Sequence, residues 1–175
     1  MTLEQALVGT KAPISIIDQL VIIDIPYISF SGLKTTGQLV VHEDLASELQ
    51  VIFEKVANLA FPIEKMIPIV QYEWDDIKSV TDNNSSGFNY RLISGTNRPS
   101  LHALGRAVDI NPRINPYFGR LGVEPAEASY DPNAKGVLFE GSSVVNIFLQ
   151  SDWTWLGRRA EYPDYQHFEK PAQSI

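Results

Sequence analysis

Two stretches of the sequence say most about the fold and its chemistry. They are Ser100-Leu-His102-Ala-Leu-Gly105-Arg-Ala107-Val-Asp109 and, further along, Asp164-Tyr-Gln-His167-Phe-Glu169. The two segments supply two histidines and an aspartate. This is the ligand count of a catalytic zinc site, in which three protein ligands leave a fourth position for water. The chain has three histidines and no cysteine, which excludes a structural zinc site closed by cysteines and also a cysteine nucleophile.

The spacing in the first segment suggests how two of these side chains reach one point. Gly105 and Ala107 lie between His102 and Asp109, so the backbone can turn tightly there. The separation is too long for adjacent turns of a helix, and we expect a loop that leads into a strand. Taken singly, a histidine is usually structural, and Asp109 suits a turn. Their joint appearance with His167 favours a metal site.

Three acidic residues accompany His167. Asp164 would lie beside it on a helical turn and could then carry a proton for the metal-bound water, whereas in an extended strand it would face away. Glu161 and Glu169 are alternatives for this role. Glu169 shares the face of His167 in a strand and could orient the imidazole through a hydrogen bond.

Arg91 and two tryptophans complete the candidates. Arg91 carries a permanent charge and five donors, which suit a developing oxyanion, although a surface salt bridge is the alternative. Trp153 and Trp155 would belong to the core or a cleft wall more often than to a ligand contact. His42 has no such neighbours in the sequence and is expected to be an ordinary polar residue near a helix start.

Composition limits the class of protein. The chain has 175 residues, of which 44% are hydrophobic and 20% charged, as in one soluble globular domain. A net charge of -7 disfavours a nucleic-acid partner, because phosphates select a basic surface. The first residues lack the pattern of a secretory signal, and no segment is apolar enough to span a membrane. We expect a monomer that is cytoplasmic as synthesised.

Hydrophobic periodicity predicts an α+β fold with a small, mostly antiparallel sheet and flanking helices. We expect residues 1–19 to form an N-terminal arm and residues 20–175 a single domain. Gly32 and Gly37 indicate a turn region. The expected strands cover 20–25, 38–41, 67–74, 88–94 and 108–110. The expected helices cover 43–60 and, capped by Ser142 or Ser143, a segment ending at Leu149, with a long loop over 111–141.

These motifs resemble a known family, the zinc D-alanyl-D-alanine carboxypeptidases and L-alanyl-D-glutamate endopeptidases of peptidoglycan. The family includes vancomycin-resistance D,D-peptidases and several phage endolysin domains. The resemblance covers about Leu20 to Lys170. It rests on Ser-x-His-x-x-Gly-x-Ala-x-Asp and Asp-x-x-His, and on three longer stretches: Asn84-Ser-Ser-Gly-Phe88-Asn-Tyr-Arg91, Asn111-Pro112-x-x-Asn115-Pro116-Tyr117 and Asp164-Tyr165-Gln166-His167-Phe168-Glu169.

The resemblance implies a small α+β domain of the kind that Hedgehog proteins share. It implies Zn²⁺ held by His102, Asp109 and His167, with Asp164 as the catalytic base. Arg91 would polarise the scissile carbonyl, and Ser100 would bind substrate, a role we also assign to Trp155.

The implied substrate is a peptidoglycan peptide, which the protein would reach if it were released or exported by another route. One alternative is a zinc-stabilised binding domain that has lost catalysis, and another is a general peptidase acting on ordinary proteins.

Overall fold

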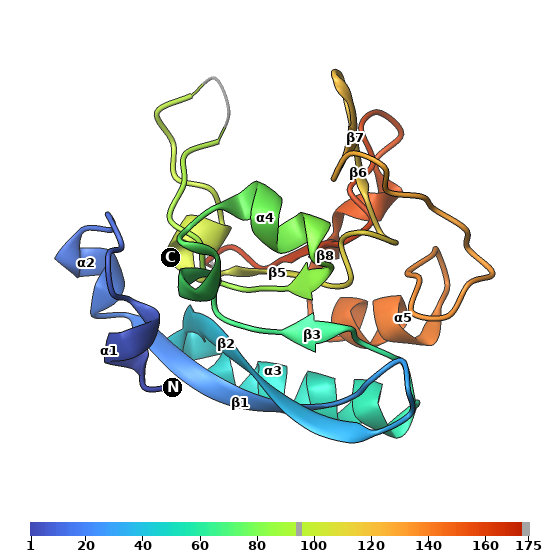
Figure 1. Cartoon of the computed structure of the whole chain (residues 1–175), viewed down its shortest axis with the longest axis horizontal. Coiled ribbons are helices and arrows are strands. Elements are labelled where there is room, and N and C mark those ends of the chain that lie inside the picture. Colours follow the sequence, from blue (N-terminus) through green and yellow to red (C-terminus); the bar gives the residue numbers. More distant parts are fainter. Residues whose placement is uncertain (94–95, 173–175) are drawn as a thin grey trace.

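A computed structural model describes residues 1–93 and 96–172. The fold is α+β, as predicted, with small sheets and few helices (Figure 1). The helices are α1 (Leu3–Ala6), α2 (Ile14–Ile17), α3 (Glu43–Asn58), α4 (Asp76–Thr81) and α5 (Ser143–Leu149), with 3₁₀ turns η1 (Ile69–Tyr72), η2 (His102–Leu104) and η3 (Leu156–Arg158). The strands are β1 (Leu20–Ile28), β2 (Lys34–His42), β3 (Lys65–Met66), β4 (Asn84–Ser85), β5 (Ala107–Asp109), β6 (Tyr117–Gly119), β7 (Gly122–Glu124), β8 (Thr154–Trp155) and β9 (His167–Glu169).

A long hairpin and one helix form the base of the molecule. Strands β1 and β2 pair antiparallel from Leu20↔His42 to Ile28↔Lys34. Helix α3 follows directly and lies along this hairpin (Figure 1). Its first turn carries Glu43 and Asp44, which suit the positive end of the helix dipole. The predicted helix is confirmed, and its apolar stripe is buried: Leu45, Leu49, Ile52, Phe53 and Val56.

A second layer covers the same core. Strands β5, β9 and β8 form an antiparallel sheet in that order. Val108 and Phe168 are partners in this sheet, and both are fully buried in the main apolar cluster. Helix α5 contributes Phe148, whose ring stacks on Phe168 with centroids 4.0 Å apart. Ser142 caps α5 by accepting a hydrogen bond from the Val145 amide, as expected from its position. Because strand side chains alternate, the neighbours of Val108 and Phe168 point to the opposite face.

The first 19 residues pack against one end of the hairpin. Ala6 is buried with Leu20, Val40 and Phe88 in a smaller apolar cluster. The Met1 amino group donates a hydrogen bond to Gln38, whose amide also contacts Asp24. These contacts join helix α1 to β1 and β2, and Ile16 of helix α2 packs against the same apolar cluster, at the left of Figure 1.

Three local predictions were wrong. The expected strand over 67–74 is instead built around the 3₁₀ turn η1, which begins directly after Pro68, a residue whose ring fixes its own backbone. Residues 88–93 are irregular apart from one bridge between Leu92 and Pro99, and Ser94 lies outside the described residues. Gly37 lies within β2, where a Cβ atom would come within 2.5 Å of Met66. This glycine permits a close approach and does not mark a turn.

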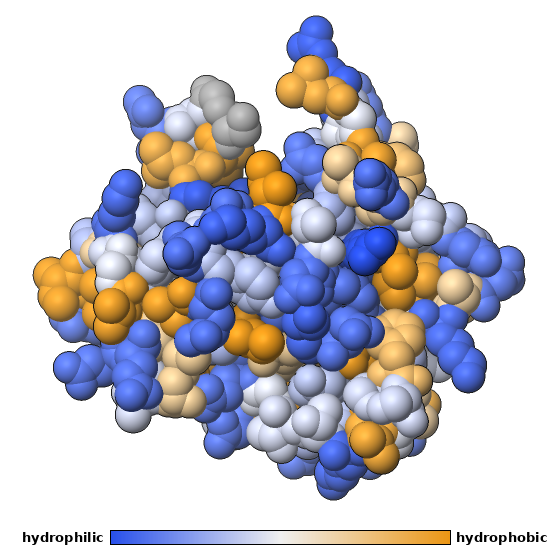
Figure 2. Space-filling view, in the orientation of Figure 1, coloured by the Kyte–Doolittle hydropathy of each residue, from blue (hydrophilic) through white to orange (hydrophobic). Residues whose placement is uncertain are grey.

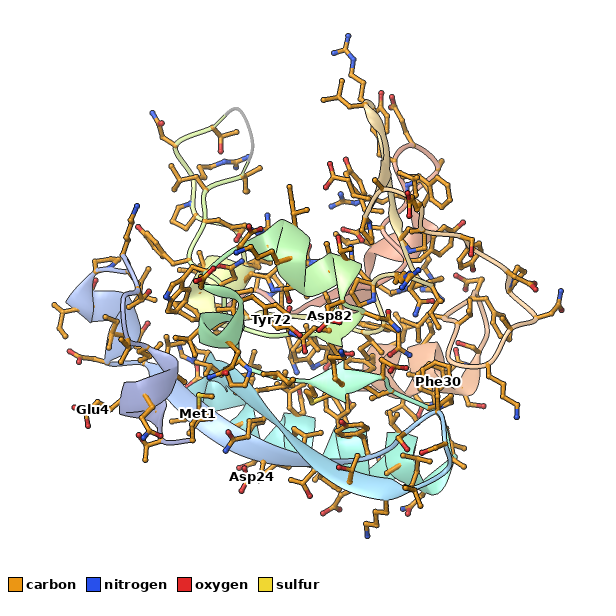
Figure 3. All side chains as sticks on the ribbon, in the orientation of Figure 1. Met1, Glu4, Asp24, Phe30, Tyr72 and Asp82 are labelled. Atoms are coloured by element: carbon orange, nitrogen blue, oxygen red, sulfur yellow. The ribbon has the colours of Figure 1, made fainter. Side chains whose placement is uncertain are left out.

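Polar contacts hold the segment between β3 and β4. The Tyr72 hydroxyl donates to Asp82 at 2.7 Å, and Lys65 lies 2.8 Å from the same carboxylate. Figure 3 shows Tyr72 and Asp82 side by side near α4. Asn84 is fully buried and binds the backbone of Ile67 through both its amide oxygen and its amide nitrogen. These contacts fix the chain that leads to Gly87. No helix in the described ranges has the length and apolar character needed to cross a bilayer.

Candidate metal centre

The sheet register places two candidate ligands side by side. Asp109 and His167 are direct cross-strand partners of β5 and β9. They lie on the face opposite Val108 and Phe168, so the apolar core fixes their backbone while their side chains meet outside it. The Nδ1 atom of His167 lies 2.9 Å from Oδ1 of Asp109. A loop and a distant C-terminal segment are thereby joined at one point.

His102 reaches the same point from the 3₁₀ turn η2. The Ser100 hydroxyl accepts a hydrogen bond from the Ala103 amide and so closes the start of this turn. Gly105 ends it with a left-handed backbone, φ +65°, which favours glycine. The chain then enters β5. The expected loop leading into a strand is confirmed, with His102 at one end and Asp109 at the other.

The three side chains converge closely. His102 Nε2 lies 3.1 Å from Asp109 Oδ2 and 3.1 Å from His167 Nδ1. One ligand atom from each residue can be chosen so that all lie within 4.8 Å of one another, and all three residues are buried. Ligand atoms held at about 2.0–2.2 Å from zinc would lie roughly 3.3–3.6 Å apart in a tetrahedron. The observed separations of 2.9 to 3.1 Å are a few tenths of an ångström shorter, so the side chains need to move apart only slightly to hold the ion.

In each ring one nitrogen faces the centre of the cluster (Nε2 of His102 and Nδ1 of His167), and the other, outer nitrogen is hydrogen-bonded away from it. The outer contacts explain why the inner nitrogens are suited to be ligands. His102 Nδ1 lies 2.6 Å from the Gly87 carbonyl oxygen, and His167 Nε2 lies 3.0 Å from Glu169 Oε2. Both partners accept hydrogen bonds, so these ring nitrogens carry the protons. In neutral rings the two inner nitrogens then present lone pairs to each other and to Asp109. A cation satisfies such a set of donors.

In the metal-free protein the ionisable groups of the cluster shift one another's pKa. Burial works to raise the pKa of Asp109, but the adjacent His102 and His167 hold it far below its usual value. Burial works to lower the pKa of His167, whereas its hydrogen bonds to Asp109 and Glu169 raise it to about 10. The hydrogen bond from His167 also lowers the pKa of Glu169. A proton on His167 thus occupies the position that a metal ion would take.

Asp164 lies at the edge of the cluster. The chain bends at Tyr165 and Gln166, and the His167 amide faces the Asp164 carbonyl at 3.4 Å, so the segment is not an extended strand. The Oδ1 atom of Asp164 is buried and has no hydrogen-bond partner among the described residues. Burial raises the pKa of Asp164 to about 6, with His167 opposing and Asp109 adding to the shift. A carboxyl group of this kind can exchange a proton near neutral pH.

The other predicted site residues lie in different surroundings. Arg91 is exposed, and its Nε lies 3.4 Å from Asp76 Oδ2, so its ion pair is the surface contact considered as the alternative. The Arg91 carbonyl accepts from the Ser100 amide, which links it to the turn of His102. Trp155 is 2% exposed, and its indole donates to the Tyr165 carbonyl. This placement favours packing over direct contact with substrate.

Sequence reasoning did not identify Gly87 as a partner of His102. A backbone carbonyl has no side-chain signature, and only the need for glycine marks the position. A Cβ at Gly87 would lie 2.5 Å from the Val40 carbonyl oxygen. The third histidine, His42, caps α3 by accepting from the Asp44 amide and takes no part in the cluster.

A separate cavity of about 810 Å³ lies away from the metal ligands. Phe30, Phe61 and Phe139 contribute to its wall, and none of the predicted site residues lines it. Figure 3 shows Phe30 in the loop between β1 and β2, near α5. Its position does not connect it to the chemistry of the histidines.

Comparison with known proteins supports the family resemblance. A family model described as D-alanyl-D-alanine carboxypeptidase matches residues 94–170, the part of the chain that carries His102, Asp109, Asp164 and His167. The resemblance predicted from the motifs is confirmed over this stretch. No curated protein and no solved structure matches the chain. The family is zinc-dependent, and the buried His-Asp-His group could bind such an ion.

Proposed function

We propose that this protein is a zinc metallopeptidase that hydrolyses the stem peptides of peptidoglycan, as a D,D-carboxypeptidase or an L-Ala-D-Glu type endopeptidase. The observation that carries the proposal is the convergence of His102, Asp109 and His167, with both outer ring nitrogens already bonded to acceptors. The family match over residues 94–170 supports the substrate class.

The chain supplies a proton carrier next to the proposed metal. A zinc ion held by His102, Asp109 and His167 would supply Lewis-acid activation of a water molecule and of the scissile carbonyl. Asp164, with a pKa of about 6 and an unpaired Oδ1 among the described residues, accepts a proton from the attacking water and returns it to the leaving amine. In the metal-free protein the two histidines lower the pKa of Asp109 despite burial, so it is ionised, which is the form that binds a metal ion.

Two further residues are proposed to hold the substrate. The ion pair between Arg91 and Asp76 is exposed on both sides and therefore weak, so Arg91 can exchange it for the oxygen of a bound carbonyl. Ser100 uses its hydroxyl oxygen as an acceptor for the Ala103 amide. The hydroxyl hydrogen stays available to donate to a substrate oxygen.

A binding domain without catalysis is the second candidate. The ion pair of Arg91 with Asp76 favours it, because Arg91 is engaged outside the metal cluster. The buried Oδ1 of Asp164, unpaired within the described part of the chain, favours the peptidase, since a purely structural metal site has no use for such a group.

Digestion of purified peptidoglycan distinguishes the two. Zinc-loaded protein is incubated with the polymer, with and without a chelator, and the released fragments are identified by mass spectrometry. The peptidase releases fragments only without chelator, and their masses separate loss of a terminal D-alanine from cleavage after L-alanine. Bound zinc without any released fragment would support the binding domain instead.

A further inference from the structure

The β6–β7 hairpin projects from the body of the molecule at the upper right of Figure 1. Its register is Tyr117↔Glu124, Phe118↔Val123 and Gly119↔Gly122, so Arg120 and Leu121 form a two-residue turn at the tip. Leu121 is 99% exposed, and Phe118 is 39% exposed. Figure 2 shows hydrophobic and hydrophilic residues side by side at this tip.

Glycine shapes this turn at the position after its two central residues. Gly122 has φ +130°, a backbone that other residues rarely adopt, whereas neither Arg120 nor Leu121 has a positive φ. Hairpins in which a positive φ follows the two central residues are common, and the central positions then accept most residue types. The turn itself therefore does not require a leucine at its most exposed position, Leu121.

The base of the hairpin is bonded to the segment that carries Asp164. Tyr117 and Asp164 form an isolated antiparallel bridge. The Phe118 amide donates to the Pro163 carbonyl at 2.9 Å, and the Tyr165 amide donates to the Pro116 carbonyl at 3.2 Å. Backbone hydrogen bonds on both sides of Asp164 thus depend on the hairpin.

Aromatic contacts strengthen the same connection. The Phe118 ring meets Tyr165 edge-on with centroids 6.0 Å apart, and Tyr130 stacks on the Tyr165 ring at 3.9 Å. Tyr165 follows Asp164 directly, so the ring contacts of Phe118 and Tyr130 help to fix the residue next to the proposed proton carrier.

We propose that the tip of the β6–β7 hairpin binds the acidic peptide of the substrate beyond the scissile bond, while its base positions Asp164 against that bound peptide. Leu121 and Phe118 offer apolar surface for alanine-type side chains, and Arg120 offers a cation for carboxylates. The protein carries a net charge of -7, so an exposed arginine at a projecting tip locally favours an anionic ligand. This inference rests on the proposed function.

The double variant Arg120→Asn/Leu121→Asn tests the binding role while keeping the turn. The hairpin should still form, because Gly119 and Gly122 are retained and asparagine is a favoured turn residue. With a soluble wall peptide as substrate, KM should rise about tenfold through loss of the Leu121 contact, while kcat stays unchanged. Leu33→Asn is the matched control, since Leu33 is 68% exposed in the loop that joins β1 and β2. It should leave KM unchanged. Leu121→Asn alone should show the same direction as the double variant.

Sedimentation of chelated, metal-free protein with insoluble peptidoglycan gives a second measurement that needs no activity. The wild type and Leu33→Asn should sediment with the polymer, and the tip variants should remain largely in solution. If the wild type sediments through its tip but cleaves nothing, the hairpin role holds and the proposed peptidase activity fails. Equal KM and equal sedimentation of wild type and tip variants would overturn the hairpin proposal, whatever the activity. A kcat loss without a KM change would also contradict it.

Discussion

The Nε2 atom of His102 lies 3.1 Å from the Nδ1 atom of His167, although the opposite nitrogen of each ring is committed to a hydrogen-bond acceptor. Two neutral imidazoles arranged in this way repel each other through their lone pairs. A proton on His167 or a cation between the rings removes that repulsion. The competition between proton and metal for this position governs the predictions below.

Asp164→Asn should separate metal binding from catalysis. Asparagine keeps the size of the side chain but cannot carry the proton, so hydrolysis should fall by about 10²- to 10⁴-fold. Zinc content, measured by mass spectrometry of the dialysed protein, should stay unchanged. Glu140→Gln, which removes an exposed ion pair with Arg158, serves as a control that keeps both properties. Loss of zinc in Asp164→Asn would show that this residue is a ligand and not a base.

Glu169→Gln should weaken metal binding without abolishing it. The carboxylate accepts a hydrogen bond from His167 Nε2 at 3.0 Å and holds the ring in the orientation that presents Nδ1. Loss of such a supporting contact lowers metal affinity by about 10- to 100-fold. Competition with a fluorescent zinc chelator measures the change. An affinity equal to that of the wild type would mean that the β-sheet alone orients His167.

The stabilising effect of zinc should increase with pH. The pKa of His167 is raised from 6.5 to about 10 in the metal-free protein. Its proton therefore stabilises the folded metal-free chain fully below pH 6.5, and this contribution is lost as the pH rises through about 10. Zinc must displace that proton, so its binding is favoured at higher pH. The increase in melting temperature on adding zinc should be larger at about pH 8.5 than at about pH 6.5. An increase that is larger at the lower pH would contradict this account.

Gly105→Ala should destabilise the fold through the turn that precedes β5. A Cβ there would lie 2.6 Å from the His42 amide nitrogen, and the backbone is left-handed at φ +65°. We expect a loss of about 2 kcal/mol or more in the free energy of unfolding, measured with urea. Gly32→Ala is a matched control, because its φ is +81° but its Cβ would meet nothing within 4 Å. A similar loss in both variants would assign the whole effect to backbone strain and none to the close approach.

The sequence predicts helix α3 from its apolar periodicity, the first part of strand β1 from the apolar run over 20–25, and helix α5 from its serine cap. It fails at 67–74, where Ile69 and Val70 look like strand residues but follow Pro68 into a 3₁₀ turn. The apolar run alone does not distinguish the two, since the decision depends on tertiary contacts. The long loop expected over 111–141 contains the β6–β7 hairpin. Its strands are three residues each, too short to show an alternating pattern, although Gly119 and Gly122 flank the turn.

The ligand residues were predictable because histidine and aspartate side chains carry the chemistry themselves. Their partners were less so: Glu169 follows from strand alternation, whereas the Gly87 carbonyl depends on a backbone path that no motif specifies. Trp155 is a side chain whose chemistry does not decide its role. An indole suits either the wall of a substrate cleft or the core, and Trp155, which is 2% exposed, lies in the core. Burial decides between such alternatives, and the sequence does not report it.

Zinc titration of the chelated protein tests the central claim most directly. Aliquots of zinc are added to metal-free protein, and the hydrolysis of purified peptidoglycan is followed at each step. Hydrolysis should rise linearly and stop rising at one zinc per chain, and Asp109→Asn should gain neither tightly bound zinc nor activity. Hydrolysis by the fully chelated protein, or full activity in Asp109→Asn, would contradict that claim.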